Sequence, residues 1–319
     1  MKNIVAIIAG EPNSINSEII SKVWLRKKFF KNLNIIVIGN YKLIKKQLKK
    51  ISLKTNILKI DSIDKPNLKK KLHILNVPLK FKDEFKVPLK NKIKYIYKCF
   101  NIGIKLAKEK KIIGLINCPV NKKDLFGNNF NGVTEFLAKK EGVLGKEAML
   151  IYNRKLSVSP ITTHIELKKI SKKLSTNKIF NKIMVINKFY LKKFKIKPNI
   201  AILGLNPHND EFRKNSEEKR IIIPAIKRLK NKKIKILGPL SADTAFIDYK
   251  KKNIDVIVGM YHDQVLSPFK TIFKFDAINI TLGLPYIRIS PDHGTGVNII
   301  KKKVANYNSL LKSIIFFKD

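Results

Sequence analysis

The stretch Ile4-Val5-Ala6-Ile7-Ile8-Ala9-Gly10-Glu11-Pro12 indicates the fold class. Its apolar part has the length of one buried strand, is too short for the apolar segment of a secretory signal, and runs directly into a polar phrase. A helix-like segment, 18–31, follows, and such pairs recur along the chain, which is typical of an α/β protein with a mainly parallel sheet. The further strand-like runs are 34–38, 57–60, 112–117, 148–152, 199–203, 235–237, 255–259 and 277–282, and the further helix-like segments are 92–110, 134–141, 216–230 and 242–252.

Length and composition narrow the class of protein. A chain of 319 residues suggests two domains or one large α/β unit, and 44% hydrophobic with 28% charged residues is typical of a globular protein. No window reaches the roughly 18 apolar residues of a membrane span. The two cysteines, Cys99 and Cys118, form no CxxC pair, so we expect a reducing compartment, with the cytoplasm as predicted location, and a buried, unreactive Cys118.

The positive charge does not by itself indicate a nucleic-acid partner. Lys plus Arg number 67 against 23 Asp plus Glu, which gives a net charge of +44, but the lysines are spread along the whole chain. Nucleic-acid readers favour arginine, which is scarce here, and no basic segment is interleaved with aromatic residues. We therefore expect no nucleic-acid partner, whereas the positive field would attract a phosphorylated or carboxylated substrate.

Three common catalytic or nucleotide-binding signatures are missing from the sequence. It has no GxGxxG after a strand, no GxxxxGK[ST] and no GxSxG. A nucleotide site, if the protein has one, must be of another design. Residues 61–91 show weak periodicity and are predicted to be irregular, and 209–216 is predicted to be a polar loop without glycine.

Three histidines, His164, His208 and His262, each come after a strand-like run. If those strands are neighbours in one sheet, the imidazoles meet and form the ligand set of a catalytic divalent cation. A structural role for each histidine is the alternative. His73 is predicted to be structural or exposed, and the fifth, His293, lies in the phrase Asp292-His293-Gly294-Thr295.

Carboxylates and cations accompany these histidines. Asp263 and Asp292 adjoin histidines and can orient them, whereas Asp243 is either part of the site or a helix N-cap. Arg288 lies between apolar residues in a chain that otherwise uses lysine, which suggests bidentate recognition of a carboxylate or phosphate. Lys270 has two readings, a site residue or one more solvated lysine.

Taken together, a set of phrases that spans nearly the whole chain resembles one family, the 4-hydroxythreonine-4-phosphate dehydrogenases of vitamin B6 biosynthesis. They are Gly10-Glu11-Pro12, Cys118-Pro119-Val120-Asn121-Lys122, Thr134-Glu135-Phe136-Leu137-Ala138, Thr162-Thr163-His164, Leu205-Asn206-Pro207-His208, Gly238-Pro239-Leu240-Ser241-Ala242-Asp243, Met260-Tyr261-His262-Asp263-Gln264, Pro268-Phe269-Lys270, Asn279-Ile280-Thr281-Leu282-Gly283-Leu284-Pro285, Ile287-Arg288 and Asp292-His293-Gly294-Thr295.

The resemblance implies a fold and a reaction. The fold is that of isocitrate and isopropylmalate dehydrogenases, with two α/β domains, mainly parallel sheets and a cleft between the domains, and the protein would be a homodimer. The expected domains are 1–125 with 286–319, and 126–285. The reaction is NAD-dependent oxidation of 4-phosphooxy-L-threonine, after which the β-keto acid loses carbon dioxide and gives 3-amino-2-oxopropyl phosphate.

The resemblance also assigns residues. It implies a divalent metal (Zn, Co or Mg) on His164, His208 and His262, with ligands drawn from both subunits. The other implied site residues are Thr134, Lys270, Asn279 and Arg288 for substrate, Asp243 and Lys270 for catalysis, and Asp292, His293, Gly294 and Thr295 for NAD.

The chain departs from the family pattern at several loops. Val133 stands where the family usually has a histidine that contacts substrate, and the loss of one such donor costs about 1–3 kcal/mol of binding. Asn209-Asp210-Glu211 replaces a glycine-rich loop, Val265 replaces a glycine, and the segment after Thr295 also differs. Three alternatives therefore stay open: a related enzyme of another phosphorylated hydroxy acid, an inactive homologue, and a nucleic-acid-associated homologue.

Overall fold

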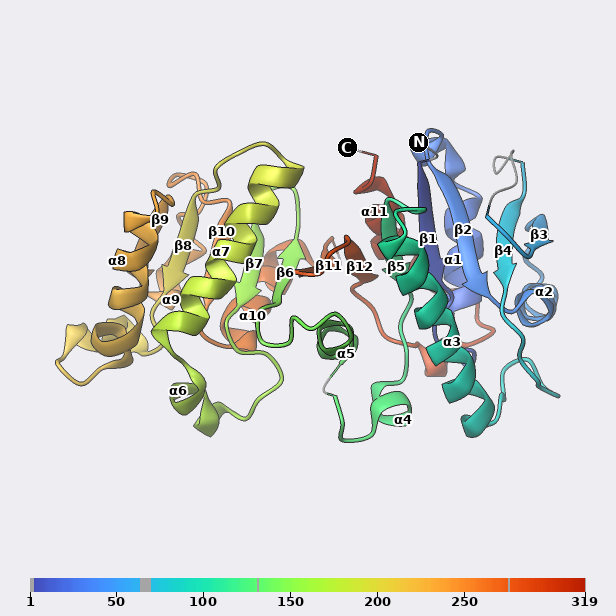
Figure 1. The fold of residues 1–319 in the computed structure, drawn as a ribbon, viewed down its shortest axis with the longest axis horizontal. Helices are drawn as coiled ribbons and strands as arrows, with labels where there is room; N and C mark the ends of the chain where they lie inside the picture. The colour runs from blue at the N-terminus through green and yellow to red at the C-terminus, as the bar shows by residue number, and fades with distance from the viewer. Residues whose placement is uncertain (1–2, 64–69, 131, 275, 319) are drawn as a thin grey trace. The chain divides into compact units, whose positions relative to one another are not determined.

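The computed structural model describes residues 3–63, 70–130, 132–274 and 276–318. The chain forms two compact units, one of Met1–Val133 with Pro285–Asp319 and one of Thr134–Leu284 (Figure 1). Each unit is a sheet with helices on both faces, so the predicted α/β class is confirmed. The expected cleft stays a prediction. In the described ranges, no helix has both the length and the apolar character that a membrane span requires.

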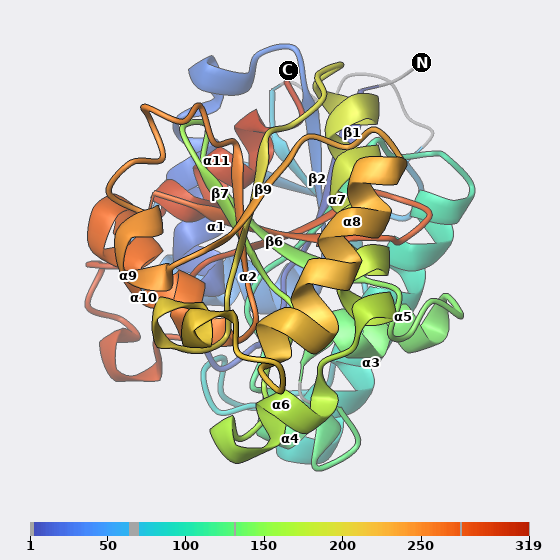
Figure 2. The same ribbon diagram turned by 90° about the vertical axis from the view of Figure 1, so that its left-hand side faces the viewer.

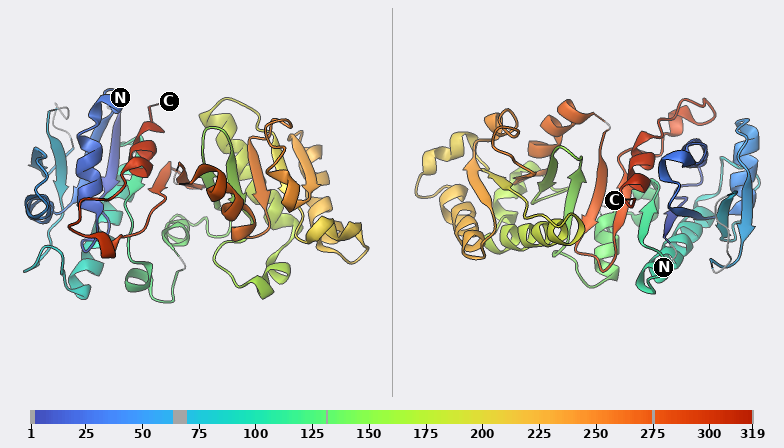
Figure 3. Two further views of the ribbon diagram at one scale, coloured as in Figure 1. Left: turned by 180° about the vertical axis from the view of Figure 1, so that it is seen from behind. Right: turned by 90° about the horizontal axis from the view of Figure 1, so that it is seen from above.

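In the first unit the sheet is entirely parallel, in the order β3-β4-β2-β1-β5-β12. All five residues of its central strand β1 are buried, because helices cover both faces. Helix α3 lies on one face, and α1 and α11 lie on the other (Figures 1 and 3). The elements are β1 (Ile4–Ile8), α1 (Asn16–Trp24), η1 (Lys27–Phe30), β2 (Asn34–Gly39), α2 (Tyr41–Lys50), β3 (Ile57–Ile60), β4 (Leu72–Asn76), α3 (Leu89–Lys108), β5 (Gly114–Asn117), α4 (Lys122–Phe126), β12 (Arg288–Pro291), η5 (Val297–Ile299) and α11 (Asn308–Ile315).

The second unit has a mixed sheet in the order β11-β6-β7-β10-β8-β9, in which β6 is antiparallel to both of its neighbours. Helices α7 and α8 lie on one face, and α9 and α10 on the opposite face (Figure 2). The elements are α5 (Val133–Lys140), β6 (Ala148–Tyr152), β7 (Ser157–Pro160), η2 (Leu167–Lys169), α6 (Ile170–Lys173), α7 (Thr176–Lys193), β8 (Ile200–Leu203), η3 (Pro207–Phe212), η4 (Glu218–Ile222), α8 (Ile223–Asn231), β9 (Ile236–Leu240), α9 (Ala242–Ala245), β10 (Val256–Gly259), α10 (His262–Phe273) and β11 (Ile278–Leu282).

The apolar runs predicted as strands are strands in the structure, within a few residues at their ends. The prediction that 61–91 is irregular is wrong at 72–76, where β4 lies between β3 and β2, and at 89–91, where α3 begins. It is confirmed at 77–88, which form no helix or strand, and residues 64–69 are outside the described ranges. The helix predicted over 242–252 is also wrong beyond Ala245, where turns follow the short α9. Lysines lie next to the short apolar run of β4 and weaken the hydrophobic periodicity of this segment, so periodicity did not reveal the strand.

Candidate active site

The three histidine-bearing loops leave neighbouring strands. Strands β7, β10 and β8 are adjacent and parallel, with β10 in the middle. Their carboxyl ends lead to His164, His262 and His208, and the carboxyl edge is where sheets of this kind bind ligands. The predicted runs 199–203 and 255–259, which precede His208 and His262, are the neighbouring strands β8 and β10. The strand that leads to His164 is β7 and not the predicted run 148–152, which is β6 and pairs with β7.

Two of these histidines lie side by side. The ring centroids of His164 and His262 are 5.7 Å apart. His262 is the first residue of α10, and its Nδ1 lies 2.6 Å from Oδ1 of Asp263. This contact occupies Nδ1 and leaves Nε2 as the ring nitrogen that can meet a ligand. Both rings are solvent-accessible, with 40% of the His164 side chain and 36% of the His262 side chain exposed.

His208 does not join this pair within one chain. It lies in η3, is exposed, and belongs to a run of non-glycine residues with positive φ that extends from His208 to Phe212. Each such residue costs roughly 1–2 kcal/mol in the left-handed region. Among the residues that the structure describes, no three His, Cys, Asp or Glu side chains form a group that would hold a metal ion.

Helix α5 and strand β11 bring two predicted substrate residues to one place. Oγ1 of Thr134 lies 3.2 Å from Oγ1 of Thr281 on β11. Asn279 precedes Thr281 by two positions and therefore points to the same face of the strand. Oδ1 of Asn279 is buried without a hydrogen-bond partner among the described residues. Glu135 follows Thr134, and its Oε1 lies 3.6 Å from Nδ1 of His164.

Asp243 and Lys270 are both exposed. Ser241 occupies the N-cap position of α9 and Asp243 lies in its first turn, so the N-cap alternative for Asp243 is wrong. Oγ of Ser241 lies 3.5 Å from Nδ2 of Asn209, which connects this loop to the His208 loop.

Lys270 lies two helical turns after His262 on α10, so both side chains are on the same side of the helix.

Sequence reasoning missed a buried lysine, Lys182, whose charge interacts with Glu147 and Glu135. Lys182 on α7 is only 6% exposed, and burial lowers its pKa to about 8, although the carboxylates of Glu147 and Glu135 counteract the shift. The 3.6-residue period of 176–193 places Lys182 on the buried side of the helix, and this position was the signal that could have revealed it. In a lysine-rich chain, a buried lysine of this kind is easily overlooked.

In the first unit, the predicted arginine and the Asp292-His293-Gly294-Thr295 phrase lie on β12 and just after it. Arg288 is 2% exposed, and its Nε donates to Oδ1 of Asn117 at 2.6 Å. Burial lowers the pKa of His293, whose Nδ1 lies 2.9 Å from the carbonyl oxygen of Gly294. Its Nε2 is buried without a hydrogen-bond partner among the described residues, so a ligand could satisfy it. The amide of Ile15 donates to the carbonyl of Thr295, which joins this phrase to the loop after β1.

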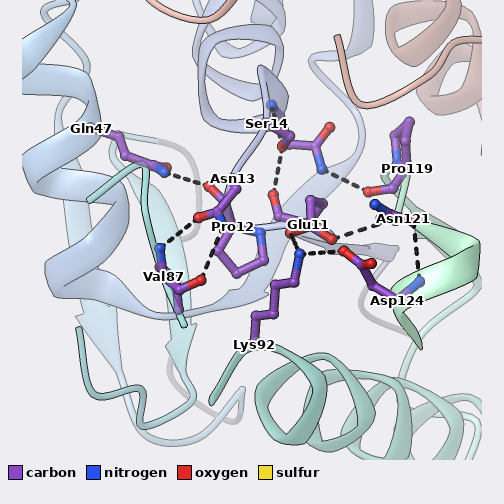
Figure 4. A network of polar contacts seen from close by, with 11 residues as sticks. Glu11, Pro12, Asn13, Ser14, Gln47, Val87, Lys92, Pro119, Asn121 and Asp124 are labelled. Atoms are coloured by element: carbon purple, nitrogen blue, oxygen red, sulfur yellow. Dashed lines mark hydrogen bonds and ion pairs between the residues drawn. The ribbon is translucent and has the colours of Figure 1, made fainter. Parts of the chain in front are cut away.

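A buried ion-pair network supports that same loop (Figure 4). Nζ of Lys92 on α3 lies 3.2 Å from Glu11 and 2.6 Å from Asp124. Burial disfavours the charge of Lys92, but the hydrogen bond to Asp124 and the Glu11 carboxylate outweigh it and raise its pKa. Glu11 also accepts from the amide of Asn121, so the network joins the loops after β1 and β5.

Cys118 is fully buried as predicted, and burial raises its pKa to about 12.

Known proteins resemble the whole chain. A family model described as "Pyridoxal phosphate biosynthetic protein PdxA" matches residues 31–316. The 4-hydroxythreonine-4-phosphate dehydrogenase of Sulfurihydrogenibium sp. is 40% identical over 97% of this chain and 96% of its own length. The D-threonate 4-phosphate dehydrogenase of Salmonella typhimurium is 33% identical over 97% and 96%. The chain therefore belongs to the PdxA family.

Solved structures agree with this assignment. The 4-hydroxythreonine-4-phosphate dehydrogenase of Klebsiella pneumoniae has a TM-score of 0.85 and 29% identity, covering 100% of this chain and 99% of that one. A β-decarboxylating dehydrogenase of Thermococcus kodakarensis shares the fold alone, with a TM-score of 0.50 and 10% identity over 98% of this chain and 81% of that one. The expected dehydrogenase fold is thus confirmed.

Proposed function

We propose that this protein is an NAD-dependent, metal-dependent 4-hydroxythreonine-4-phosphate dehydrogenase that oxidises and decarboxylates 4-phosphooxy-L-threonine. The observation that carries the proposal is the pairing of His164 with His262 at the carboxyl ends of β7 and β10, next to Thr134 and Glu135. The names of relatives that match nearly the full chain support the same substrate class.

The donor set suits a divalent cation. His262 has its Nδ1 against Asp263, so its Nε2 is the nitrogen available as a ligand, and His164 lies beside it. We propose that His164, His208 and His262 hold the cation, with His208 contributed across a homodimer, because the described residues of one chain bring only the first and last together. The bound cation would act as a Lewis acid on the oxygen of the alcohol being oxidised.

The chain's own residues would bind and orient the substrate. Thr134 and Asn279 present a hydroxyl and an amide on one face of β11, where polar groups can accept or donate to a hydroxy acid. Lys270 and Arg288 are the cations proposed to bind the negatively charged ends of the substrate. Asp243 is proposed to act in proton transfer, because it follows the strand beside the one that leads to His208.

We propose that Asp292, His293, Gly294 and Thr295 contact NAD. The buried Nε2 of His293 supports this assignment, because it has no partner among the described residues and a ligand would complete its hydrogen bonding. NAD would accept the hydride, while the protein supplies position and exclusion of water. We further propose that the domains are 1–125 with 286–319, and 126–285, and that the enzyme acts in the cytoplasm without a nucleic-acid partner.

NADH production at 340 nm from metal-loaded protein given 4-phosphooxy-L-threonine tests the proposal. The wild type should turn over, a chelator should stop turnover until Co²⁺ or Zn²⁺ is returned, and His208→Ala should be inactive. Lys251→Ala, an exposed change on a turn away from the histidine loops, is the control and should retain full activity. No turnover by folded, metal-loaded wild type would refute the proposed reaction.

A second candidate is the oxidation of a different phosphorylated hydroxy acid. The 33% identical relative named D-threonate 4-phosphate dehydrogenase favours it, as does the apolar Val133, which cannot donate a hydrogen bond beside Thr134. Parallel kcat/KM measurements with 4-phosphooxy-L-threonine and D-threonate 4-phosphate distinguish the two. The substrate whose kcat/KM is at least tenfold higher is the substrate of the enzyme. A tenfold ratio corresponds to about 1.4 kcal/mol of difference in transition-state stabilisation.

A further inference from the structure

One side-chain amide joins the strand ends that lead to His208 and His262. Nε2 of Gln264 on α10 donates to the carbonyl oxygen of Gly204 after β8 at 2.7 Å. Its Oε1 accepts from the backbone amide of Met260 after β10, also at 2.7 Å. Because β8 and β10 are neighbours, this single side chain fixes the exit of one loop relative to the other.

A buried carboxylate holds the first residues of the His208 loop, just after β8. Glu218, the first residue of η4, is fully buried. Its Oε1 accepts from the backbone amides of Leu205 at 2.7 Å and Asn206 at 2.9 Å, and its Oε2 accepts from Nδ2 of Asn206 at 3.1 Å. Within the described part of the chain, these bonds come from amide groups rather than from a lysine or arginine, although the sequence has 67 of those residues. A buried carboxylate placed in this way specifies loop geometry.

The packing around these contacts leaves little freedom. A Cβ at Gly204 would lie 2.1 Å from Oδ1 of Asn209 and 3.1 Å from Oε1 of Glu218, so a larger residue there would displace the Asn209 side chain. On the other side, Oγ1 of Thr162 donates to the carbonyl of Met260 at 2.7 Å. The chain of contacts therefore reaches all three histidine loops, from Glu218 through Gln264 to Thr162.

We propose that Glu218 and Gln264 are positioning residues that hold the His208 loop and the His262 loop in one fixed arrangement, so that each histidine is presented ready to bind the cation. This inference rests on the proposed function for the identity of the ligand, and on hydrogen bonds alone for the coupling of the loops. Neither side chain touches the reacting atoms. Each acts through the backbone of the loop that it holds.

The first test is metal affinity, measured by Co²⁺ titration of the full-length protein. Glu218→Leu replaces the carboxylate with an apolar side chain of similar size, which leaves the Leu205 and Asn206 amides without their acceptor, and it should weaken Co²⁺ binding about 10–100-fold. Glu218→Gln keeps an oxygen acceptor and should recover most of the affinity. Glu217→Gln is the matched control. The contact of Glu217 with Asn206 involves the side-chain amide of Asn206 and not its backbone, so this variant should bind Co²⁺ like the wild type.

The second test is hydrogen exchange of single backbone amides, which does not depend on metal or substrate. In Glu218→Leu, the Met260 amide should exchange about tenfold faster or more, although it lies on the other loop. In Gln264→Leu, the Leu205 and Asn206 amides should respond in the same way. Faster exchange confined to the loop that carries the substitution would overturn the coupling.

The two tests separate the inference from the proposed function. Wild-type protein that binds no Co²⁺ and produces no NADH would refute the proposed function, while the exchange measurement would still decide whether the loops are coupled. Coupled exchange with unchanged Co²⁺ affinity in folded Glu218→Leu protein would make these residues structural and would overturn the positioning role.

Discussion

The rings of His164 and His262 lie 5.7 Å apart, centroid to centroid, although they belong to loops far apart in the sequence. The pairing of β7 with β10 makes this possible, since Gly259 lies opposite Pro160 at the carboxyl ends of the two strands. The short 2.6 Å contact of Asp263 with His262 then occupies Nδ1 and leaves Nε2 as the ring nitrogen for a ligand. The sheet register and one neighbouring carboxylate together create the geometry of the candidate metal site.

Asp263→Asn should weaken Co²⁺ binding about 10–100-fold and lower kcat by a similar factor. The amide no longer carries the charge that favours the proton on Nδ1 of His262, so the ligand nitrogen becomes less basic. A Co²⁺ titration beside steady-state kinetics measures both effects. Asp248→Asn removes a carboxylate from an exposed pair with Lys252 and should change neither quantity. Equal affinities in the two variants would contradict a role for Asp263.

Asn279→Leu should lower kcat/KM for the phosphorylated substrate about 10–100-fold while KM for NAD stays unchanged. The buried Oδ1 of Asn279 has no partner among the described residues, so loss of a bond to a charged ligand would cost roughly 1.5–3 kcal/mol. Steady-state kinetics with each substrate varied in turn makes the measurement. A selective rise in KM for NAD would instead move Asn279 to the cofactor's side of the reaction.

Lys92→Met should reduce the free energy of unfolding by about 3–5 kcal/mol, because it leaves the buried Glu11 carboxylate and Asp124 without their cation. Urea unfolding followed by circular dichroism gives the value. The control is Lys105→Met, which breaks an exposed pair with Glu109 and should cost less than about 0.5 kcal/mol. Similar losses in both variants would show that the Glu11 network contributes no more than a surface pair.

Stability should decline as pH falls below about 6.5, in part because of His73. This side chain is buried on β4, and burial lowers its pKa in the folded state. The unfolded chain therefore binds a proton at a pH where the folded chain does not, so the stabilising contribution is complete above the unfolded pKa and is lost as pH falls towards the folded pKa. In His73→Leu, the drop in unfolding free energy between about pH 7.5 and about pH 5.5 should be smaller than in the wild type. An identical drop in the variant would exclude His73 as a source.

The sequence alone determined the fold class and most of its strands. Buried parallel strands are continuous apolar runs, and the runs at β1, β2, β6 and β10 are visible without any tertiary information. The sequence also shows polar segments directly after those strands. Open α/β sheets bind ligands at the carboxyl ends of their strands, so these segments could be predicted as site loops. The short strand β7 was missed, since its residues Ser157-Val158-Ser159-Pro160 lack an apolar signal, and only pairing with β10 and β6 defines it.

Only the tertiary structure decided which side chains meet. Periodicity says which residues are buried, but the order of strands in a sheet depends on contacts between distant segments. That order brought His164 to His262, kept His208 apart within one chain, and assembled Gln264 with Glu218 around the loops between them. It also buried Lys92 and Lys182 in a chain with 67 cationic residues, because burial depends on what packs against a helix and not on the residue type.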